Sequence, residues 1–443
     1  MTKKVGIVSL GCAKNLVNTE QMMFLLKEAG YTVTGETDGA DAVIVNTCGF
    51  IDRAKMEAID TILELDEERK QGRLGKIIVT GCFAERYKEE ILTEMPEIDG
   101  VVGVGSFEEI VDALDSVLKS DKRIAVFGDI DAPISETKRI ITTSRAWAYI
   151  KIAEGCDNRC AFCIIPKLRG KFRSRPMENI VGEAKALADS GVKEVILVAQ
   201  DSTRYGLDLY GRRNLAELLT ELSKIENLRW IRLHYLYPDD ITEELIDVIA
   251  NNKKILKYID MPIQHINDAV LQKMNRRGNG KQVRELIKKL RERISGVVIR
   301  TSIIAGLPGE GEEEFEELYE FLKSEKIERA GVFRYSPEEE TIAATMPRPD
   351  TELADKRTEA LAHLQSHIID EFNDSRIGTT TTVLIDGKSN KQYLGRSFAE
   401  SPDVDGYINI LSEENIDVGE FYKVKITEVI DGEPVGKPIG RDI

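Results

Sequence analysis

The sequence predicts a multidomain α/β protein of three parts: a domain built on a parallel sheet, a partial barrel of six β/α units, and a small antiparallel β barrel. Three observations predict this. Apolar strands alternate with amphipathic helices from residue 4, a second series of six strand candidates follows a polar linker at 129–145, and β-branched residues and turns prevail after residue 376. A chain of 443 residues is long enough for two or three hydrophobic cores.

The first part, placed at residues 1–128, contains at least three strands of a parallel sheet. Apolar runs at 5–10, 41–46 and 76–80 have the composition of buried strands. An amphipathic stretch at 17–29, and another that begins near Asp52, predict helices between them. This alternation is typical of a parallel sheet wrapped by helices.

Each of these strands is followed within two residues by a cysteine, at Cys12, Cys48 and Cys82. Because the carboxyl ends of parallel strands lie along one edge of a sheet, we expect the three thiols to meet there. Buried structural cysteine is the ordinary explanation for any one of them. Three at equivalent positions indicate a metal site instead.

The other three cysteines, Cys156, Cys160 and Cys163, share one loop with C-x3-C-x2-C spacing. Thiolates so spaced can face one point, as a soft metal centre requires. A structural zinc site would need a fourth ligand, and the next Cys or His along the chain is His234. An iron–sulfur cluster with three cysteine ligands keeps one iron open for a cofactor or a substrate. A zinc knuckle and a simple electron carrier are the alternatives.

Six strand candidates around and after this loop predict an open or partial barrel. They lie at 148–152, 194–199, 230–236, 258–263, 298–304 and 331–335. Polar residues follow several strand ends, where the active face of a barrel lies. They are Gln200, Asp201, His234, Tyr235, Gln264, His265, Arg334 and Tyr335. We expect this set to line a pocket, although a turn or a helix cap would explain each one alone.

A basic strip at 167–175, KLRGKFRSR, directly follows the cysteine loop. A solvated loop is the usual meaning of such a run. Because the strip is tethered to Cys163, its cations can also hold a carboxylate of a cofactor or a substrate.

The last part, placed at 376–443, follows a predicted connecting helix at 351–373. Strand-like runs at 379–385, 392–398, 407–411 and 421–430, separated by turns, predict a small antiparallel barrel. Small barrels often bind RNA through a basic surface, but acidic residues outnumber basic ones here, twelve to eight. This acidity, and the net charge of −16 of the whole chain, favour a basic protein as partner over a nucleic acid.

The composition also predicts a compartment. No apolar run reaches membrane-spanning length, and the run at 5–10 is too short for the core of a signal peptide. We therefore expect the protein in the cytosol, where thiols stay reduced and clustered cysteines bind metals.

The cysteine loop, with Phe162 directly before its last cysteine, resembles that of the radical S-adenosylmethionine (SAM) enzymes. With the three separated cysteines, and with GRS at 395–397 and PDVDG at 402–406, the whole chain resembles the methylthiotransferases. That resemblance implies a flavodoxin-like domain at 1–128, a radical SAM domain at 142–373 and a TRAM domain at 376–443. It also implies two [4Fe–4S] clusters, an auxiliary one on the separated cysteines and a SAM-binding one on the loop cysteines.

The resemblance further implies where SAM binds. Phe162 would lie against the adenine, and the strand end that carries Gly306 would pass beside it. We expect Gln200 and Gln264, at other strand ends, and Arg175, in the basic strip, to contribute to the same cofactor site.

Four segments resemble one branch of the family: SLGCAKN at 9–15, IIPKLRG at 164–170, RSR at 173–175 and AQDSTRYG at 199–206. That branch methylthiolates the β-carbon of an aspartate on the small-subunit ribosomal protein S-twelve. The alternative branch modifies an isopentenyl-adenosine beside the tRNA anticodon. Both reactions imply an electron donor such as flavodoxin or ferredoxin. An iron–sulfur or zinc scaffold without chemistry is the alternative of a different class.

Overall fold

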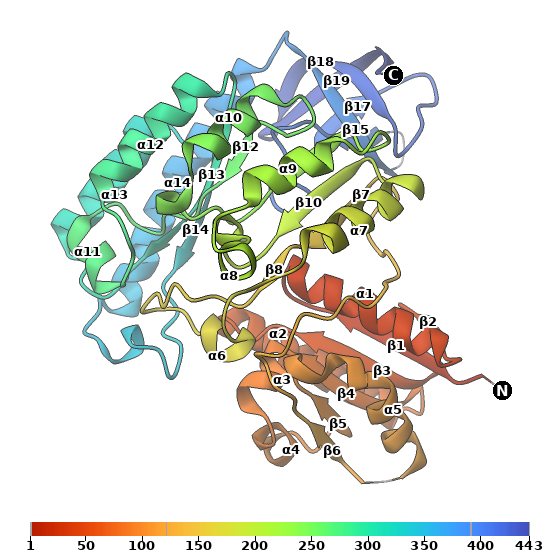
Figure 1. Cartoon of the computed structure of the whole chain (residues 1–443). Coiled ribbons are helices and arrows are strands. Elements are labelled where there is room, and N and C mark those ends of the chain that lie inside the picture. Colours follow the sequence, from red (N-terminus) through yellow and green to blue (C-terminus); the bar gives the residue numbers. More distant parts are fainter. Residues whose placement is uncertain (1, 121, 390–391, 443) are drawn as a thin grey trace.

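The computed structural model describes residues 2–120, 122–389 and 392–442, and its three parts follow the predicted order along the chain (Figure 1). The N-terminal part is a parallel six-stranded sheet in the order β2-β1-β3-β4-β5-β6. This arrangement contains the strand order 2-1-3-4-5 of flavodoxin, so the predicted flavodoxin-like class is confirmed.

The elements of this part alternate as the sequence predicts. Its strands are β1 Lys4–Ser9, β2 Thr32–Thr34, β3 Ala40–Thr47, β4 Leu74–Gly81, β5 Gly100–Val102 and β6 Ile124–Val126. Its helices are α1 Ala13–Glu28, α2 Asp52–Lys70, α3 Cys82–Tyr87, α4 Glu90–Glu94 and α5 Ile110–Lys119, with a 3-10 turn at Val104–Glu109.

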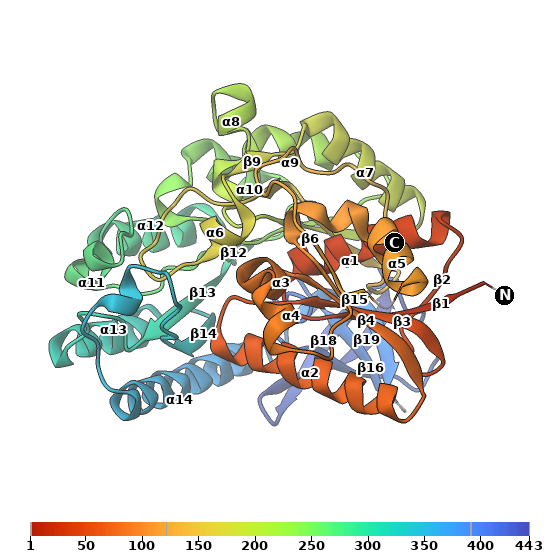
Figure 2. The same cartoon turned by 90° about the horizontal axis from the view of Figure 1, so that it is seen from below.

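Helices cover both faces of this sheet (Figure 2). On one face, Met22 of α1 packs in a cluster with Ile44 of β3, and α5 contributes to the same cluster. On the other face, Ile62 of α2 packs in a cluster with Val43 of β3. Because β3 is buried on both sides, its sequence is a continuous apolar run rather than an alternating one.

The middle part is an open half barrel of six strands. The strands β7 Trp147–Lys151, β10 Glu194–Val198 and β11 Trp230–Leu233 form one parallel sheet, and β12 Tyr258–Asp260, β13 Val298–Ala305 and β14 Arg329–Arg334 form another. A parallel bridge between Ile231 and Ile255 joins the two sheets. The predicted partial barrel of six strands is therefore confirmed.

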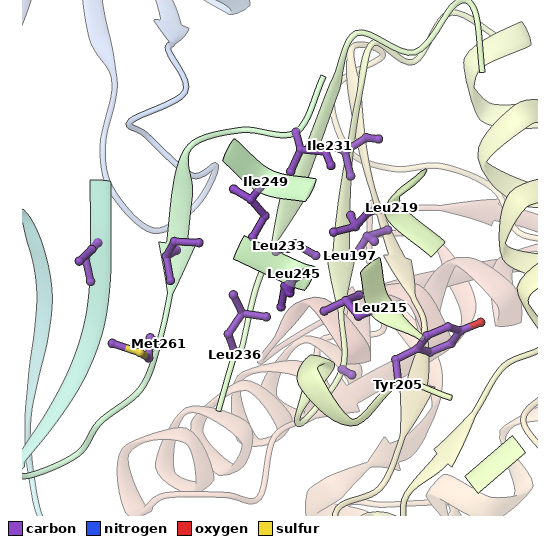
Figure 3. Packing of buried hydrophobic residues seen from close by; sticks show 14 of the residues in the cluster. Leu197, Tyr205, Leu215, Leu219, Ile231, Leu233, Leu236, Leu245, Ile249 and Met261 are labelled. Carbon is purple, nitrogen blue, oxygen red and sulfur yellow. The ribbon is translucent and has the colours of Figure 1, made fainter. Parts of the chain in front are cut away.

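Helices pack on the outer face of the half barrel. They are α7 Met177–Asp189, α9 Leu215–Ser223, α10 Glu243–Asn251, α12 Gly280–Arg293, α13 Glu312–Glu325 and α14 Thr351–Ser375. The shorter helices α6 Ile165–Arg169, α8 Leu207–Tyr210 and α11 Asp268–Lys273 lie outside this layer. Figure 3 shows part of the largest apolar cluster, in which Leu197 of β10 and Leu233 of β11 pack with Leu219 of α9. This cluster fixes the strands on which the site depends.

The inner face of the half barrel carries charged and aromatic side chains. Along β11, Leu233 belongs to the outer cluster, whereas Arg232 points inward, as the two-residue period of a strand requires. Its Nε lies 2.8 Å from the carboxylate of Glu194. Such a face needs polar partners, and two segments from outside the barrel supply them.

One of these segments is helix α1, which lies between the N-terminal sheet and the barrel (Figure 1). Its Asn18 accepts a hydrogen bond from Nζ of Lys151 at 3.0 Å, and its Val17 packs against Ile196 and Val198 of β10. The other segment comes from the terminal part, whose Arg396 is fully buried and lies 2.9 Å from the Glu194 carboxylate. The N-terminal and terminal parts are thus docked into opposite ends of the barrel.

The terminal part is a closed barrel of five strands in the order β15-β16-β17-β19-β18. They are β15 Thr380–Ser389, β16 Gln392–Arg396, β17 Ile408–Leu411, β18 Phe421–Ile430 and β19 Glu433–Arg441. The predicted small barrel is confirmed with one departure, because β17 and β19 pair in parallel. Among the described residues, no helix is both long and apolar enough to cross a membrane.

Candidate functional site

The three separated cysteines come together at one edge of the N-terminal sheet. Cys12 precedes α1, Cys48 follows β3 and Cys82 begins α3, and the strands β1, β3 and β4 before them are direct neighbours. Burial raises the pKa of the Cys48 thiol to about 12, and the nearby Cys82 and Cys12 raise it further. The three thiols therefore lie within electrostatic reach of one another, as the strand ends predict.

A glycine allows this close approach. Gly11 has φ +89°, and a Cβ on it would lie 2.8 Å from Cβ of Cys48. Any side chain at position 11 would push the loops that carry Cys12 and Cys48 apart. Asn15 holds the same loops by donating from Nδ2 to the carbonyl oxygens of Thr47 at 2.9 Å and Leu10 at 3.2 Å.

An arginine of the middle part reaches this thiol group. Arg169, at the end of α6, is buried, and its Nε donates to Sγ of Cys82 at 3.3 Å. Its other nitrogens donate to Glu154 Oε2 at 3.1 Å and to Asn15 Oδ1. Figure 1 shows α6 beside α3, the contact through which Arg169 crosses between the two parts.

Charge makes the three thiols unequal. Burial would raise the pKa of Cys12, but the positive charges of Lys14 and Arg169 outweigh it and lower this pKa below its ordinary value. Burial raises the pKa of Cys82 although Arg169 opposes the shift. Cys12 is therefore the thiol of this group that ionises most readily.

The loop cysteines form a second group at the mouth of the half barrel. The antiparallel pair β8 Ala153–Glu154 and β9 Arg173–Ser174 closes the base of their loop. Gly155, with φ +77°, lets the backbone turn where a Cβ would lie 2.0 Å from the carbonyl oxygen of Lys171. Burial raises the pKa of Cys156 to about 11, with Asp201 and Cys160 adding to the shift.

This second group is partly enclosed by apolar residues. Cys160 and Cys163 pack against a cluster that contains Phe162 and Leu307. Burial raises the pKa of Cys163, and the nearby Cys160 and Cys156 raise it further. Arg276 donates from Nη1 to Sγ of Cys160 at 3.6 Å. Each thiol group thus has one arginine hydrogen-bonded to a sulfur atom.

The donor set fits a cluster better than one metal ion. All six thiols are free. Among the described residues, no three Cys, His, Asp or Glu side chains converge as ligands of a single ion would. A cluster in which each thiolate binds a different iron holds its sulfur ligands farther apart, and N–H donors to sulfur are typical of its surroundings.

The residues expected to hold SAM lie at several places. Phe162 is buried beside Leu307. Gly306 has φ +78° and donates its amide to both carboxylate oxygens of Glu310 at 3.0 Å. Gln264 follows β12 with φ +70°, a conformation that is costly for a residue with a side chain and is often kept at functional sites. These residues therefore surround the mouth of the half barrel.

Gln200 and Arg175 differ in what they can still bind. Gln200 donates to Oε1 of Glu154 at 2.6 Å, and its own Oε1 is buried without a partner among the described residues. The guanidinium of Arg175 already donates to Glu183 at 2.7 Å, to Glu136 and to a backbone carbonyl. Gln200 is thus free to accept a hydrogen bond, whereas Arg175 is engaged by protein groups.

Other charges of the basic strip are also paired within the protein. Lys167 lies 2.6 Å from Glu340, and Arg173 lies 3.4 Å from Asp131. Arg169, which sequence reasoning placed in the strip without a role, is the one that touches a thiol.

Sequence reasoning missed two further polar residues of this interface. Lys14 of α1 reaches the barrel, and Glu154 binds both Lys151 at 2.8 Å and Arg169 at 3.1 Å. Neither residue has a local sequence pattern that indicates its partners. For Lys14, the signal in the sequence is its position two residues after Cys12.

Three family models match the chain: the radical SAM superfamily at residues 150–322, the uncharacterized protein family UPF0004 at 4–103, and the TRAM domain at 377–439. With the cysteine loop at the mouth of a half barrel, fold and site define a radical SAM protein. The chain is 48% identical to "Ribosomal protein uS12 methylthiotransferase RimO" of Caldanaerobacter subterraneus subsp. tengcongensis, over 98% of this chain and 100% of that protein. The same name belongs to a Clostridioides difficile protein that is 45% identical over 98% of each chain. The chain belongs to the RimO family of radical SAM methylthiotransferases.

Solved structures share the fold at low sequence identity. The radical S-adenosylmethionine methyltransferase TsrM from Kitasatospora setae superposes with a TM-score of 0.56, covering 95% of this chain and 84% of its own, at 16% identity. The cobalamin-dependent S-adenosylmethionine radical enzyme OxsB superposes with a TM-score of 0.51, covering 82% of this chain and 56% of its own, at 14% identity. Both similarities concern the fold alone.

Proposed function

We propose that this protein adds a methylthio group to the β-carbon of an aspartate of ribosomal protein uS12, the S-twelve protein of the small subunit. One observation carries the proposal: two groups of three free thiols lie on adjoining parts of the chain. Across the interface, Arg169 binds Cys82 of one group and Glu154 at the base of the loop that carries the other. The relatives that are 45% and 48% identical to this chain carry the name of this activity.

The two thiol groups would hold two [4Fe–4S] clusters, an auxiliary one on Cys12, Cys48 and Cys82 and a SAM-binding one on Cys156, Cys160 and Cys163. When bound, SAM and the clusters supply the methyl group, the sulfur chemistry and a 5′-deoxyadenosyl radical that removes hydrogen from the substrate carbon. A C–H bond without an activating base needs such chemistry, and the protein's task is to bind and to orient.

The residues of the chain serve this task in distinct ways. Phe162 and Gly306 would lie against the adenine, and the buried Leu307, which packs with Phe162, would keep water from it. Gln200 presents an unpaired oxygen to a hydrogen-bond donor of the cofactor. Gln264 lies at the same mouth of the half barrel, after β12. Arg169 and Arg276 direct N–H groups at sulfur, which stabilises negative charge on the thiolates.

We assign these tasks to three domains: the auxiliary cluster to residues 1–128, SAM binding to 142–373, and docking of the partner to the TRAM domain at 376–443. The terminal domain favours a protein over a tRNA, because acidic residues outnumber basic ones there and Arg396 is fully buried. A flavodoxin or a ferredoxin in the cytoplasm would supply the electrons.

Mass spectrometry tests the proposal directly. Protein uS12 and tRNA are compared between cells that lack this gene and cells that carry it. We expect the methylthio mass to disappear from uS12 and to remain on tRNA. Loss of the modification from tRNA with uS12 unchanged would support the tRNA branch instead. A colourless, zinc-containing protein that releases no 5′-deoxyadenosine would support the scaffold.

A further inference from the structure

Lys14 is a buried cation without a carboxylate partner. The residue is 7% exposed, and its Nζ donates a long hydrogen bond, 3.4 Å, to the carbonyl oxygen of Ala199. The same nitrogen lies 3.9 Å from the centre of the Tyr235 ring. Within the described part of the chain, Lys14 forms no ion pair with an Asp or Glu carboxylate, although its charge acts on the Cys12 thiol. Burial of an unpaired charge is unfavourable, so the site has capacity for an anion.

The ammonium group lies between the N-terminal thiols and the carboxyl ends of the barrel strands. Lys14 is on the first turn of α1, two residues after Cys12. Its contacts, Ala199 and Tyr235, follow the carboxyl ends of β10 and β11 at the mouth of the half barrel. A group bound to this nitrogen would therefore sit between the N-terminal thiols and the barrel.

The backbone beneath the cation is held in a strained conformation. Tyr235 has φ +61°, which is rare for an aromatic residue. Its amide donates to Oδ2 of Asp260 at 3.0 Å, and its carbonyl oxygen accepts from the amide of Ser202 at 2.9 Å. These bonds fix the ring under the ammonium group of Lys14. Strain of this kind is typically kept where it positions a functional group.

Glu154, the carboxylate of this interface whose charge acts on Lys14, is already neutralised. Glu154 binds Lys151 at 2.8 Å and Arg169 at 3.1 Å, and it accepts a further hydrogen bond from Gln200. It has no carboxylate oxygen left for Lys14. The anion that completes the Lys14 site must come from outside the described chain or from the sulfur ligands near Cys12.

We propose that Lys14 selects an acidic side chain in the substrate, by pairing its ammonium group with the carboxylate of the aspartate that is modified. The inference rests on the proposed function and names the group that recognises the substrate carboxylate. In aspartate the β-carbon carries the carboxylate, so a cation that fixes the carboxylate also fixes the C–H bond to be broken. A neutral amide of the same shape would leave the cation buried and unpaired, so an asparagine at this position of the substrate would bind more weakly.

The test compares two peptides on the holoenzyme. A fluorescent peptide that spans the target aspartate of uS12, and its Asp-to-Asn analogue, are titrated with the anaerobically reconstituted protein. We expect the wild type to bind the aspartate peptide about tenfold to a hundredfold more tightly, the range of a hydrogen bond to a charged group. Lys14→Met should abolish the preference by weakening the binding of the aspartate peptide and not that of the asparagine peptide, whereas Lys14→Arg should keep a preference.

Matched measurements separate the possible outcomes. Lys27→Met, an exposed lysine at the end of the same helix, should keep the wild-type preference. Equal affinity of the wild type for both peptides overturns the inference, even if Lys14→Met does not fold. So does a Lys14→Met variant that keeps the preference but loses iron, because Lys14 then serves only the cluster. Absence of methylthio transfer by the wild type, measured on the same samples, contradicts the proposed function instead.

Discussion

Replacing Arg169 by methionine tests the link between the two domains. The substitution keeps most of the side-chain volume and removes a guanidinium that is 2% exposed. It breaks the contacts with Glu154 at 3.1 Å, with Cys82 at 3.3 Å and with Asn15. Removal of one partner of a buried ion pair costs about 3–5 kcal/mol. Because Lys151 remains 2.8 Å from Glu154, we expect the lower end, about 3 kcal/mol.

Urea unfolding of the metal-free protein, followed by tryptophan fluorescence, measures this change. Both tryptophans, Trp147 and Trp230, begin strands of the half barrel and report on that unit. The control is Lys167→Met on the same short helix, where an exposed ion pair with Glu340 contributes about 0.5 kcal/mol or less. Equal losses of unfolding free energy in the two variants would refute a structural role for Arg169.

Three further predictions follow from charge and burial. In the metal-free protein, iodoacetamide should alkylate Cys12 faster than Cys48 near neutral pH, because the pKa of Cys12 is lowered and that of Cys48 is raised. Peptide mass spectrometry measures the two rates, and the reverse order would contradict the charge argument. Burial lowers the pKa of His234 to about 4, so protons bind to the unfolded state first as the pH falls. The free energy of unfolding should therefore decrease by about 3 kcal/mol between about pH 6.5 and pH 4, and unfolding curves at several pH values should show a smaller decrease for His234→Gln. Glu194→Gln should destabilise the protein by about 3 kcal/mol, because Arg232 loses its carboxylate while Arg396 keeps Asp386. An unchanged unfolding midpoint would exclude Glu194 as the anchor of the terminal domain.

Much of the fold could be predicted from the sequence because local patterns determine it. The apolar runs at 41–46 and 76–80 lie within β3 and β4, and the helix expected from Asp52 begins at that residue. The last strand, β19, was missed, because Pro434 and Pro438 interrupt its apolar pattern. It forms all the same, since the closed barrel supplies β17 and β18 as neighbours on both sides.

The site could be predicted only as far as its cysteines. Their position after parallel strands is a local feature, and it brings Cys12, Cys48 and Cys82 to one edge. The groups that tune them are not local. Arg169 meets Asn15 across 154 positions of sequence, and Lys14 meets Ala199 across 185. Such contacts depend on how two domains dock, which no periodicity within either domain encodes.

The iron content of two triple variants tests the central claim most directly. One replaces Cys12, Cys48 and Cys82 by alanine, and the other replaces Cys156, Cys160 and Cys163. After anaerobic reconstitution, each variant should hold half the iron of the wild type, and only the first should still release 5′-deoxyadenosine from SAM. A variant that loses all of its iron, or none, would contradict two separate clusters of three thiolates each.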